Sequence, residues 1–330
     1  MDHASPVSIR VCHLYPKLLS VAGDRGNLFA ITRRCAWRGI EASVVEADVG
    51  DVPDFTQFDL ILLHGGQDCE MRAAASDLKQ KAGSLREAIE SDAVVLAVCA
   101  GYQLLGKCYA PVGAPAITGI GVLDAVTEGG TTRFMSHIAV ACDLGPGGQH
   151  RLVGFENHSG RTYLGPGTEP LGQVIAGSGN NGQDGTEGAR YREVYATYLH
   201  GPLLPKNPWL TDQLIFMALR HRYQDVEQAD LLTPLDDQAE AAAHAAAFRL
   251  ACRRERGWRA AMPAGGWWRR LGSRDVPAGT TPPGDMTPQA GTASPAAEAP
   301  QAGTASQAAS ADPPGGGIEP DGEGMAWTSR

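Results

Sequence analysis

The most informative feature of the sequence is an apolar run that ends at Cys99. Residues 93–98 are all apolar, the small residues Ala100 and Gly101 follow the cysteine, and an apolar helical pattern continues from Tyr102. A buried parallel strand that turns sharply into a helix has this pattern. Such a nucleophile elbow exposes its side chain at a strained turn, and the first N–H groups of the helix can hold an oxyanion. The segment therefore predicts a cysteine nucleophile, although a buried structural cysteine would also fit it.

A thiolate nucleophile needs a base within hydrogen-bond reach, and several histidines compete for that role. His200 ends the strand-like segment 195–199 and opens a Gly-Pro turn, so it is the preferred candidate. The competing residues are His64, His137 and His158. A structural histidine at a strand end is the other interpretation of His200.

Two polar segments follow predicted strands. The buried segment 60–63 ends at His64-Gly65-Gly66, and glycines at the carboxyl edge of a sheet let backbone N–H groups approach a ligand, as an oxyanion hole requires. An ordinary loop fits these glycines equally well. Residues 153–162 are dense in polar groups, which is typical of a loop that faces a ligand.

Composition bounds the function classes. The chain has 330 residues and a net charge of −9, which argues against nucleic acid as a partner and against a polybasic membrane-binding surface. Seven cysteines without paired spacing predict free thiols in a reducing compartment and no zinc site. We find no apolar run long enough to span a membrane and no signal-peptide pattern, so we expect a cytoplasmic protein.

The first 262 residues alternate predicted strands and helices, which indicates an α/β domain with a mostly parallel, flavodoxin-like sheet and helices on both faces. The early strands are predicted at 7–14, 41–46, 58–63 and 93–98, with helices at 27–37 and 72–89. Later strands lie closer together and predict antiparallel or mixed pairs, at 121–126, 134–141, 153–156, 173–176 and 193–198. Helices at 209–223 and 236–256 end the domain.

Residues 263–330 predict a disordered tail. The segment consists mainly of Ala, Gly, Pro, Ser and Thr, and the heptapeptide at 288–294 recurs at 300–306. Such low-complexity sequence has too little apolar surface to offset chain entropy. A basic patch with Trp258, Trp267 and Trp268 spans the start of the tail, and predicts either a solvated helix end and linker or a docking or membrane-surface element.

Seven stretches, in their order and spacing, resemble class I (triad-type) glutamine amidotransferase domains over about residues 7–225. Within that class the likeness is greatest to the glutaminase subunits of bacterial lipid II isoglutaminyl synthases, in the cobyric-acid-synthase-like branch. The stretches are Leu14-Tyr15-Pro16, Gly23-Asp24-Arg25-Gly26-Asn27, Trp37-Arg38-Gly39, His64-Gly65-Gly66-Gln67-Asp68, Val98-Cys99-Ala100-Gly101-Tyr102-Gln103, Gly154-Phe155-Glu156-Asn157-His158 and the segment from Leu199-His200-Gly201-Pro202 to Pro208.

The resemblance implies that the chain hydrolyses glutamine. Cys99 would attack the side-chain amide carbon, and His200 would relay the proton to the departing ammonia before water hydrolyses a glutamyl thioester. The resemblance further implies backbone N–H groups of Gly66 and Ala100 as the oxyanion hole. Arg133 would bind the α-carboxylate of the substrate, because an arginine fork suits that group.

The resemblance also places Gln103 among the substrate-binding residues, and two positions depart from the family pattern. The family usually has glycine at position 100, so the elbow must accept the methyl group of Ala100. Most triad amidotransferases carry a glutamate two residues after the histidine, where this chain has Pro202. The residue that orients His200 is therefore not identified, and a Cys–His dyad stays open.

The partners follow from the resemblance. We expect a heterodimer with a Mur-ligase-like (MurT-type) synthetase subunit, which would use ATP and Mg²⁺ to amidate D-glutamate in the lipid II stem peptide, at the inner face of the membrane. No cofactor is expected in this chain. Residues 101–107 match the P-loop spacing, but Cys108 stands where Ser or Thr must bind Mg²⁺.

Three other functions stay open at this point. One is a glutaminase for cobyric or cobyrinic acid amidation, although those enzymes usually have an ATPase domain upstream and the first predicted strand here begins at Val7. Another is a non-catalytic scaffold, against which Cys99 and His200 argue. The last is a different cysteine hydrolase on the same fold, such as a peptidase.

Overall fold

The computed structural model describes residues 7–20, 23–144, 148–224, 227 and 232–261, with side chains up to residue 253. The predicted tail from residue 263, with Trp267 and Trp268, lies outside the described residues, as does the side chain of Trp258. No helix within the described residues has the length and apolarity needed to cross a membrane.

The first sheet confirms the predicted parallel arrangement. Its strand order is β11-β12-β4-β3-β1-β2, and every neighbouring pair is parallel except β11 with β12. The strands β3 and β4 lie in the middle and are buried along their whole length, because they are apolar on both faces. The bounds are β1 (Ser8–Leu14), β2 (Glu41–Ala47), β3 (Leu60–Leu63), β4 (Val94–Val98), β11 (Ala189–Tyr191) and β12 (Val194–Thr197).

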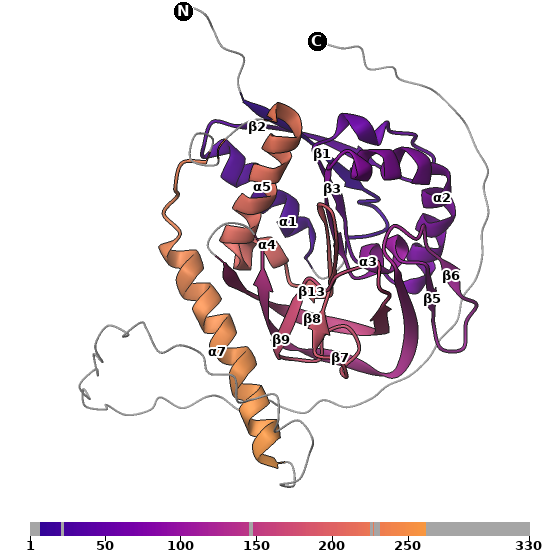
Figure 1. The fold of residues 1–330 in the computed structure, drawn as a ribbon, viewed down its shortest axis with the longest axis vertical. Helices are drawn as coiled ribbons and strands as arrows, with labels where there is room; N and C mark the ends of the chain where they lie inside the picture. The colour runs from indigo at the N-terminus through magenta and orange to yellow at the C-terminus, as the bar shows by residue number, and fades with distance from the viewer. Residues whose placement is uncertain (1–6, 21–22, 145–147, 225–226, 228–231, 262–330) are drawn as a thin grey trace, which may run out of the picture. The chain divides into compact units, whose positions relative to one another are not determined.

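Helices cover both faces of this sheet (Figure 1). On one face α2 (Asp68–Glu90) and α3 (Ala100–Leu105) pack over a core that includes Leu78, Leu85 and Leu104. On the other face α1 (Arg25–Ala36), α4 (Leu203–Lys206) and α5 (Pro208–Tyr223) bury Ile31 and Leu214. A short 3₁₀ turn, η1 (Phe55–Gln57), precedes β3.

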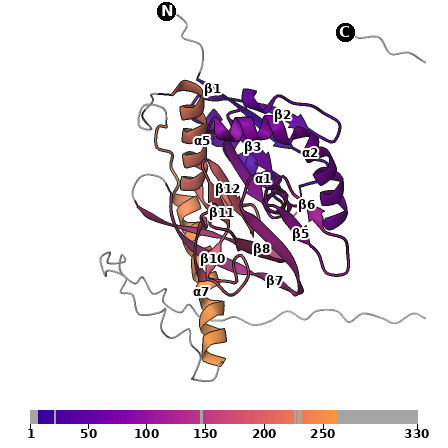
Figure 2. The same cartoon turned by 45° about the vertical axis from the view of Figure 1, so that its right-hand side comes forward.

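A second, mixed sheet lies beside the first, below it in the view of Figure 2. Its centre is the hairpin-like pair of long strands β7 (Ala125–Asp143) and β8 (Gln149–Leu164), which are antiparallel. The prediction of two strands at 121–126 and 134–141 was wrong, because β7 is continuous and only shifts its register between Gly129 and Phe134. The other members are β5 (Cys108–Ala110), β6 (Ile117–Thr118), β9 (Gly172–Ala176), β10 (Thr186–Glu187) and β13 (Leu199–His200).

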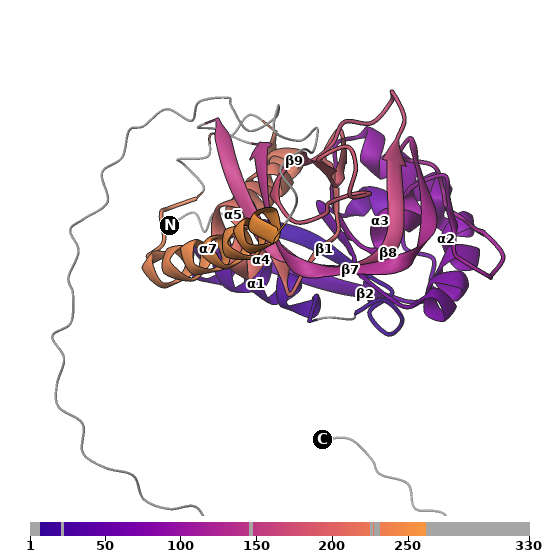
Figure 3. The same cartoon turned by 90° about the horizontal axis from the view of Figure 1, so that it is seen from below.

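The Ala-rich helix α7 (Gln238–Ala261) confirms the predicted final helix and packs on the second sheet (Figure 3). Its Ala251 is buried together with Ala139, Val153 and Ala176, and small residues let the helix approach the strands closely.

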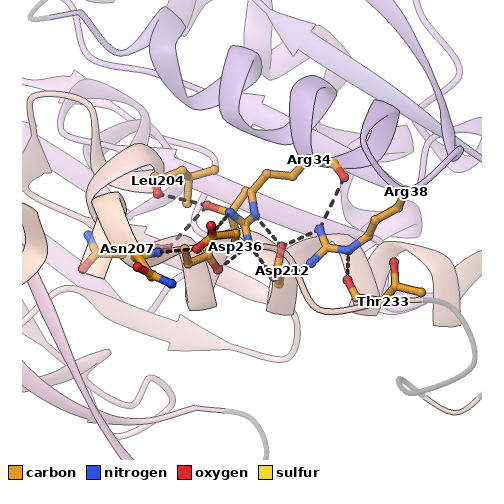
Figure 4. A network of polar contacts seen from close by, with 10 residues as sticks. Arg34, Arg38, Leu204, Asn207, Asp212, Thr233 and Asp236 are labelled. Carbon is orange, nitrogen blue, oxygen red and sulfur yellow. Dashed lines mark hydrogen bonds and ion pairs between the residues drawn. The ribbon is translucent and has the colours of Figure 1, made fainter. Parts of the chain in front are cut away.

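An arginine cluster ties α1 to α5 and to the segment before α7 (Figure 4). Arg34 donates to both carboxylate oxygens of Asp212 at 2.6 Å and to Asp237 at 2.6 Å. Arg38 also donates to Asp212, at 2.7 and 3.0 Å, and to the carbonyl oxygen of Thr233 at 2.8 Å. Two bidentate arginines on one part-buried aspartate fix the geometry of this corner of the domain.

Candidate active site

Cys99 occupies the turn between β4 and α3 in the strained conformation that the sequence predicts. Its φ is 53° and its ψ is −101°, a conformation that residues other than glycine rarely adopt. The backbone N–H of Cys99 donates to the carbonyl oxygen of Thr197 at the end of β12. A Cβ atom at Gly101 would lie 2.3 Å from the carbonyl oxygen of Leu63, so only glycine lets α3 approach β3 this closely.

The departure at position 100 is accommodated by the core. Ala100 is 1% exposed and belongs to the hydrophobic cluster beneath α2 and α3, so its methyl group is buried instead of blocking the turn. As the first residue of α3, it presents its N–H at the start of the helix, beside Cys99.

His200 stands where the chain passes from the first sheet to the second. The strand β12 ends at Thr197 beside β4, and Leu199 and His200 then pair with β8. Because β12 and β4 are parallel neighbours, the histidine and Cys99 lie at the same carboxyl edge. Cys99 and His200 line the same cavity, and Cys99 is close enough to raise the pKa of the ring.

The residue that orients His200 is Asp24, which the sequence interpretation did not identify. Its carboxylate oxygens lie 3.1 and 3.2 Å from Nδ1 of His200, and it is fully buried. It also accepts the backbone N–H of Gly65 at 3.2 Å. Pro202 fills the position where most triad enzymes carry a glutamate, and it packs against Gly26, where a Cβ atom would lie 2.5 Å from Cγ of Pro202. The acid therefore comes from the N-terminus of α1.

Electrostatics favour a charged histidine in this array. Burial lowers the pKa of His200, but the hydrogen bond to Asp24 and the nearby sulfur of Cys99 outweigh it and raise the pKa from 6.5 to about 10. At neutral pH the ring is therefore an imidazolium between a carboxylate and a sulfur. An imidazolium carries a proton on each nitrogen, so it can donate on both sides at once.

The competing histidines have other environments. His64 is buried, its Nδ1 lies 3.1 Å from Nε2 of His13, and burial lowers its pKa to about 3. His158 stacks on Tyr198 with 3.7 Å between ring centroids, and burial lowers its pKa to about 3 as well. His137 lines a neighbouring cavity. Among the residues that the structure describes, only His200 of these four lines the cavity of Cys99.

That cavity has a volume of about 670 Å³ and is open to solvent. It brings together four residues that the sequence interpretation singled out, Cys99, His200, Gly66 and Arg133. A Cβ atom at Gly66 would lie 2.3 Å from Cδ2 of Leu19, so a larger residue there would displace that buried side chain. The remaining lining residues are Gln67, Asp68, Cys69, Asn157 and Ser159.

Arg133 is exposed, and within the described residues its side chain donates hydrogen bonds to Asn157. Its Nε donates to Oδ1 of Asn157 at 2.6 Å, and Nη2 donates to the carbonyl oxygen of the same residue at 3.2 Å. Two bonds to one asparagine fix the plane of the guanidinium, so the fork is already oriented in the cavity.

Gln103, which the resemblance places among the substrate-binding residues, points toward the interior of the domain. Its side chain is buried, Nε2 donates to the hydroxyl of Tyr198 at 3.1 Å, and Gly160 packs against it. It is not among the residues that line the cavity of Cys99 in the described part of the chain. The short helix α3 turns this side chain into the domain, where it supports the wall of the site.

The P-loop-like spacing of residues 101–107 does not form a phosphate cradle. The residues 101–105 are part of α3, and a Cβ atom at Gly106 would lie 3.0 Å from the carbonyl oxygen of Ala125, so the backbone is packed against β7. Lys107 pairs with Asp124. Among the described residues, no group of His, Cys, Asp and Glu is placed to hold a metal ion.

Comparisons with known proteins identify the family of the chain. A sequence model of the CobB/CobQ-like glutamine amidotransferase domain matches residues 10–208. The lipid II isoglutaminyl synthase (glutamine-hydrolyzing) subunit GatD of Staphylococcus aureus is 37% identical over 232 residues, which cover 70% of this chain and 91% of that protein. The GatD subunit of Streptococcus pneumoniae is 36% identical over 228 residues, covering 68% and 86%. A cobyric acid synthase of Pelotomaculum thermopropionicum is 33% identical over 132 residues, covering 36% and 25%.

Proposed function

The chain belongs to the CobB/CobQ-like glutamine amidotransferase family, and from that premise we propose that it hydrolyses glutamine as the GatD-type subunit of a lipid II isoglutaminyl synthase. The observation that carries the proposal is the contiguous array of Cys99, His200 and Asp24 at the edge of an open cavity. The GatD relatives are matched over 86–91% of their length, whereas the cobyric acid synthase is matched over 25% of its length, and this difference favours the lipid II enzyme.

The reaction begins with attack of the Cys99 thiolate on the side-chain amide carbon of glutamine. The imidazolium of His200 then donates its proton to the nitrogen, and ammonia leaves as a γ-glutamyl thioester forms. The neutral ring next accepts a proton from water, which attacks the thioester and releases glutamate. Asp24 keeps the ring oriented and stabilises its charged form, which is the role of the acid in a triad.

The oxyanion that forms at each tetrahedral step needs two donors. We assign this role to the backbone N–H groups of Gly66 and Ala100, which lie at the Gly-Gly turn after β3 and at the first residue of α3. Preorganised backbone donors of this kind stabilise the developing charge without reorganisation. Throughout these steps the α-carboxylate of glutamine is bound by Arg133, whose guanidinium is oriented by Asn157.

The ammonia has a use only if a synthetase receives it. The relatives are named as subunits of a glutamine-hydrolysing synthase, and we extend this to a Mur-ligase-like, MurT-type partner that holds ATP and Mg²⁺ and amidates the lipid II stem peptide. Small shifts of the turns that hold Cys99 and Gly66 would lower the rate of hydrolysis by large factors. We therefore expect the isolated chain to hydrolyse glutamine slowly, and the heterodimer, in which the partner aligns these turns, to hydrolyse it faster.

The test compares two cysteines of the same cavity in the full chain with its synthetase. Cys99→Ser should abolish ammonia release from L-glutamine, whereas Cys69→Ser should keep it. Amidation of lipid II from added ammonium salt should survive in both variants, because the synthetase site is on the partner. Glutamine hydrolysis by Cys99→Ser at the wild-type rate would refute the proposal, as would failure of the chain to co-elute with any Mur-ligase-like subunit.

A further inference from the structure

A second charge faces the cavity that contains Cys99. Asp68 is the first residue of α2 and lines the cavity together with Arg133. Both side chains are exposed, and neither forms a salt bridge within the described part of the chain, with the other or with a third residue. The cavity therefore presents one cationic and one anionic side chain, Arg133 and Asp68, which form no salt bridge with each other.

The wall around these charges is polar. Ser159 and Asn157 line the cavity beside these charges, and the buried Tyr109 lies near enough to Asp68, Cys99 and Arg133 for their charges to act on its hydroxyl. Burial raises the pKa of Tyr109 and Asp68 raises it further, which is the effect that a nearby negative charge has on a phenol. Asp68, Arg133 and the nucleophile are thus all close enough to act on one hydroxyl.

A free amino acid carries two charged groups on its α-carbon, an ammonium and a carboxylate. An anionic and a cationic side chain at the wall of a site, at a distance from the atoms that react, can bind these two groups through charge-assisted hydrogen bonds. We propose that Asp68 binds the α-ammonium group of L-glutamine and Arg133 its α-carboxylate, so that the side-chain amide reaches Cys99. This inference rests on the proposed glutaminase function and makes Asp68 the residue that selects substrates with a free α-amino group.

A carboxylate in the first turn of a helix also affects the stability of that helix, apart from any contact with a substrate. It stabilises the helix dipole whether or not a ligand binds. Glu70 lies in the same first turn of α2, accepts the thiol of Cys69 at 2.6 Å and is not among the cavity-lining residues. It is the matched control, because Glu70→Gln removes the same charge from the same turn outside the cavity.

The first measurement compares two substrates of the full chain with its synthetase. L-Glutamine has the α-amino group, and glutaric acid monoamide lacks it. Asp68→Asn should lower kcat/KM for L-glutamine on the order of tenfold or more, which is the scale of a charge-assisted hydrogen bond. The same substitution should change kcat/KM for the monoamide by less than about twofold, because the monoamide has no α-ammonium group to lose. Asp68→Glu should restore part of the preference, and Glu70→Gln should leave it at the wild-type value.

The second measurement follows covalent labelling of Cys99 and needs no turnover. The diazoketone analogue of L-glutamine should label Asp68→Asn more slowly than wild type, whereas iodoacetamide, which has no amino-acid head group, should label both at the same rate. If Asp68→Asn keeps the wild-type preference for L-glutamine, the assignment of Asp68 is wrong and the glutaminase function stands. If the wild type hydrolyses neither substrate and labels with iodoacetamide alone, the proposed function itself fails.

Discussion

Nδ1 of His200 lies 3.1 Å from Oδ2 of Asp24, a residue 176 positions earlier in the chain. The contact joins His200, at the end of β13, to the residue that precedes α1. The Asp24 side chain is fully buried. It completes a cysteine–histidine–aspartate array in a chain that lacks the glutamate two residues after the histidine. Asp24, which precedes α1, thus contacts the ring of His200 in place of a glutamate from the segment after the histidine.

Asp24→Asn should leave the fold intact and impair catalysis through His200. Removing the carboxylate's charge should lower kcat for glutamine hydrolysis by about a hundredfold or more, because the ring loses its orientation and the stabilisation of its protonated form. The variant should also slow alkylation of Cys99 by iodoacetamide near neutral pH. Unchanged alkylation with normal turnover would show that the contact is structural only.

The same contact makes stability depend on pH. The pKa of His200 is 6.5 in the reference state and about 10 in the folded protein, so the folded state binds this proton more tightly. Its contribution to the free energy of unfolding is fully present below pH 6.5 and is lost as pH rises through 10. Urea unfolding of wild type should show this decline between pH 6.5 and 10, and Asp24→Asn should flatten it. Equal slopes in the two proteins would contradict the assignment.

Arg133→Ala should chiefly raise KM for glutamine, because the α-carboxylate loses its bidentate partner while Cys99 and His200 keep their contact. Arg133→Lys should not restore the wild-type KM, since an ammonium cannot present a planar fork. Steady-state kinetics of the two variants provide the check. A wild-type KM in Arg133→Ala would assign the carboxylate to another residue.

Arg34→Ala should destabilise the domain without changing the chemistry of the site. Arg34 is 5% exposed and pairs with Asp212 and Asp237, so its loss leaves two part-buried carboxylates less well compensated and should lower the free energy of unfolding by about 3 kcal/mol. Arg25→Ala is the control, because its pair with Glu46 is exposed and contributes less than about 1 kcal/mol. Equal denaturation midpoints for the two variants would refute this role of the cluster.

The sequence predicts Cys99 and His200 because each follows an apolar strand at the carboxyl edge of a parallel sheet, where side chains of neighbouring strands meet. It does not identify Asp24, because that residue lies in the connection before α1 and reaches His200 only through the strand order β4-β3-β1. An acid between the first strand and the first helix is a sequence signal for this position, since the carboxyl end of β1 lies beside that of β3 at the edge of the sheet that carries the site.

The orientation of Gln103 and the continuity of β7 have local causes. Gln103 follows the elbow by one helical turn, and the orientation of a six-residue helix depends on its packing and not on an apolar pattern. The segment 129–133 contains two glycines and two threonines and predicts a break, but in the structure it is an irregularity within the single strand β7. Bulges of this kind carry no strong sequence signal, although they often occur beside active sites, as Arg133 does here.

The central claim is that glutamine is hydrolysed through a thioester on Cys99. The most direct measurement is to mix the chain and its synthetase with L-glutamine, quench in acid within the first turnovers and examine the Cys99 peptide by mass spectrometry. We predict a γ-glutamyl group on Cys99 in the wild type, none on Cys69, and none on any residue in Cys99→Ser. Steady release of ammonia by the wild type with no glutamyl adduct on Cys99, or an adduct on another residue, would contradict the account.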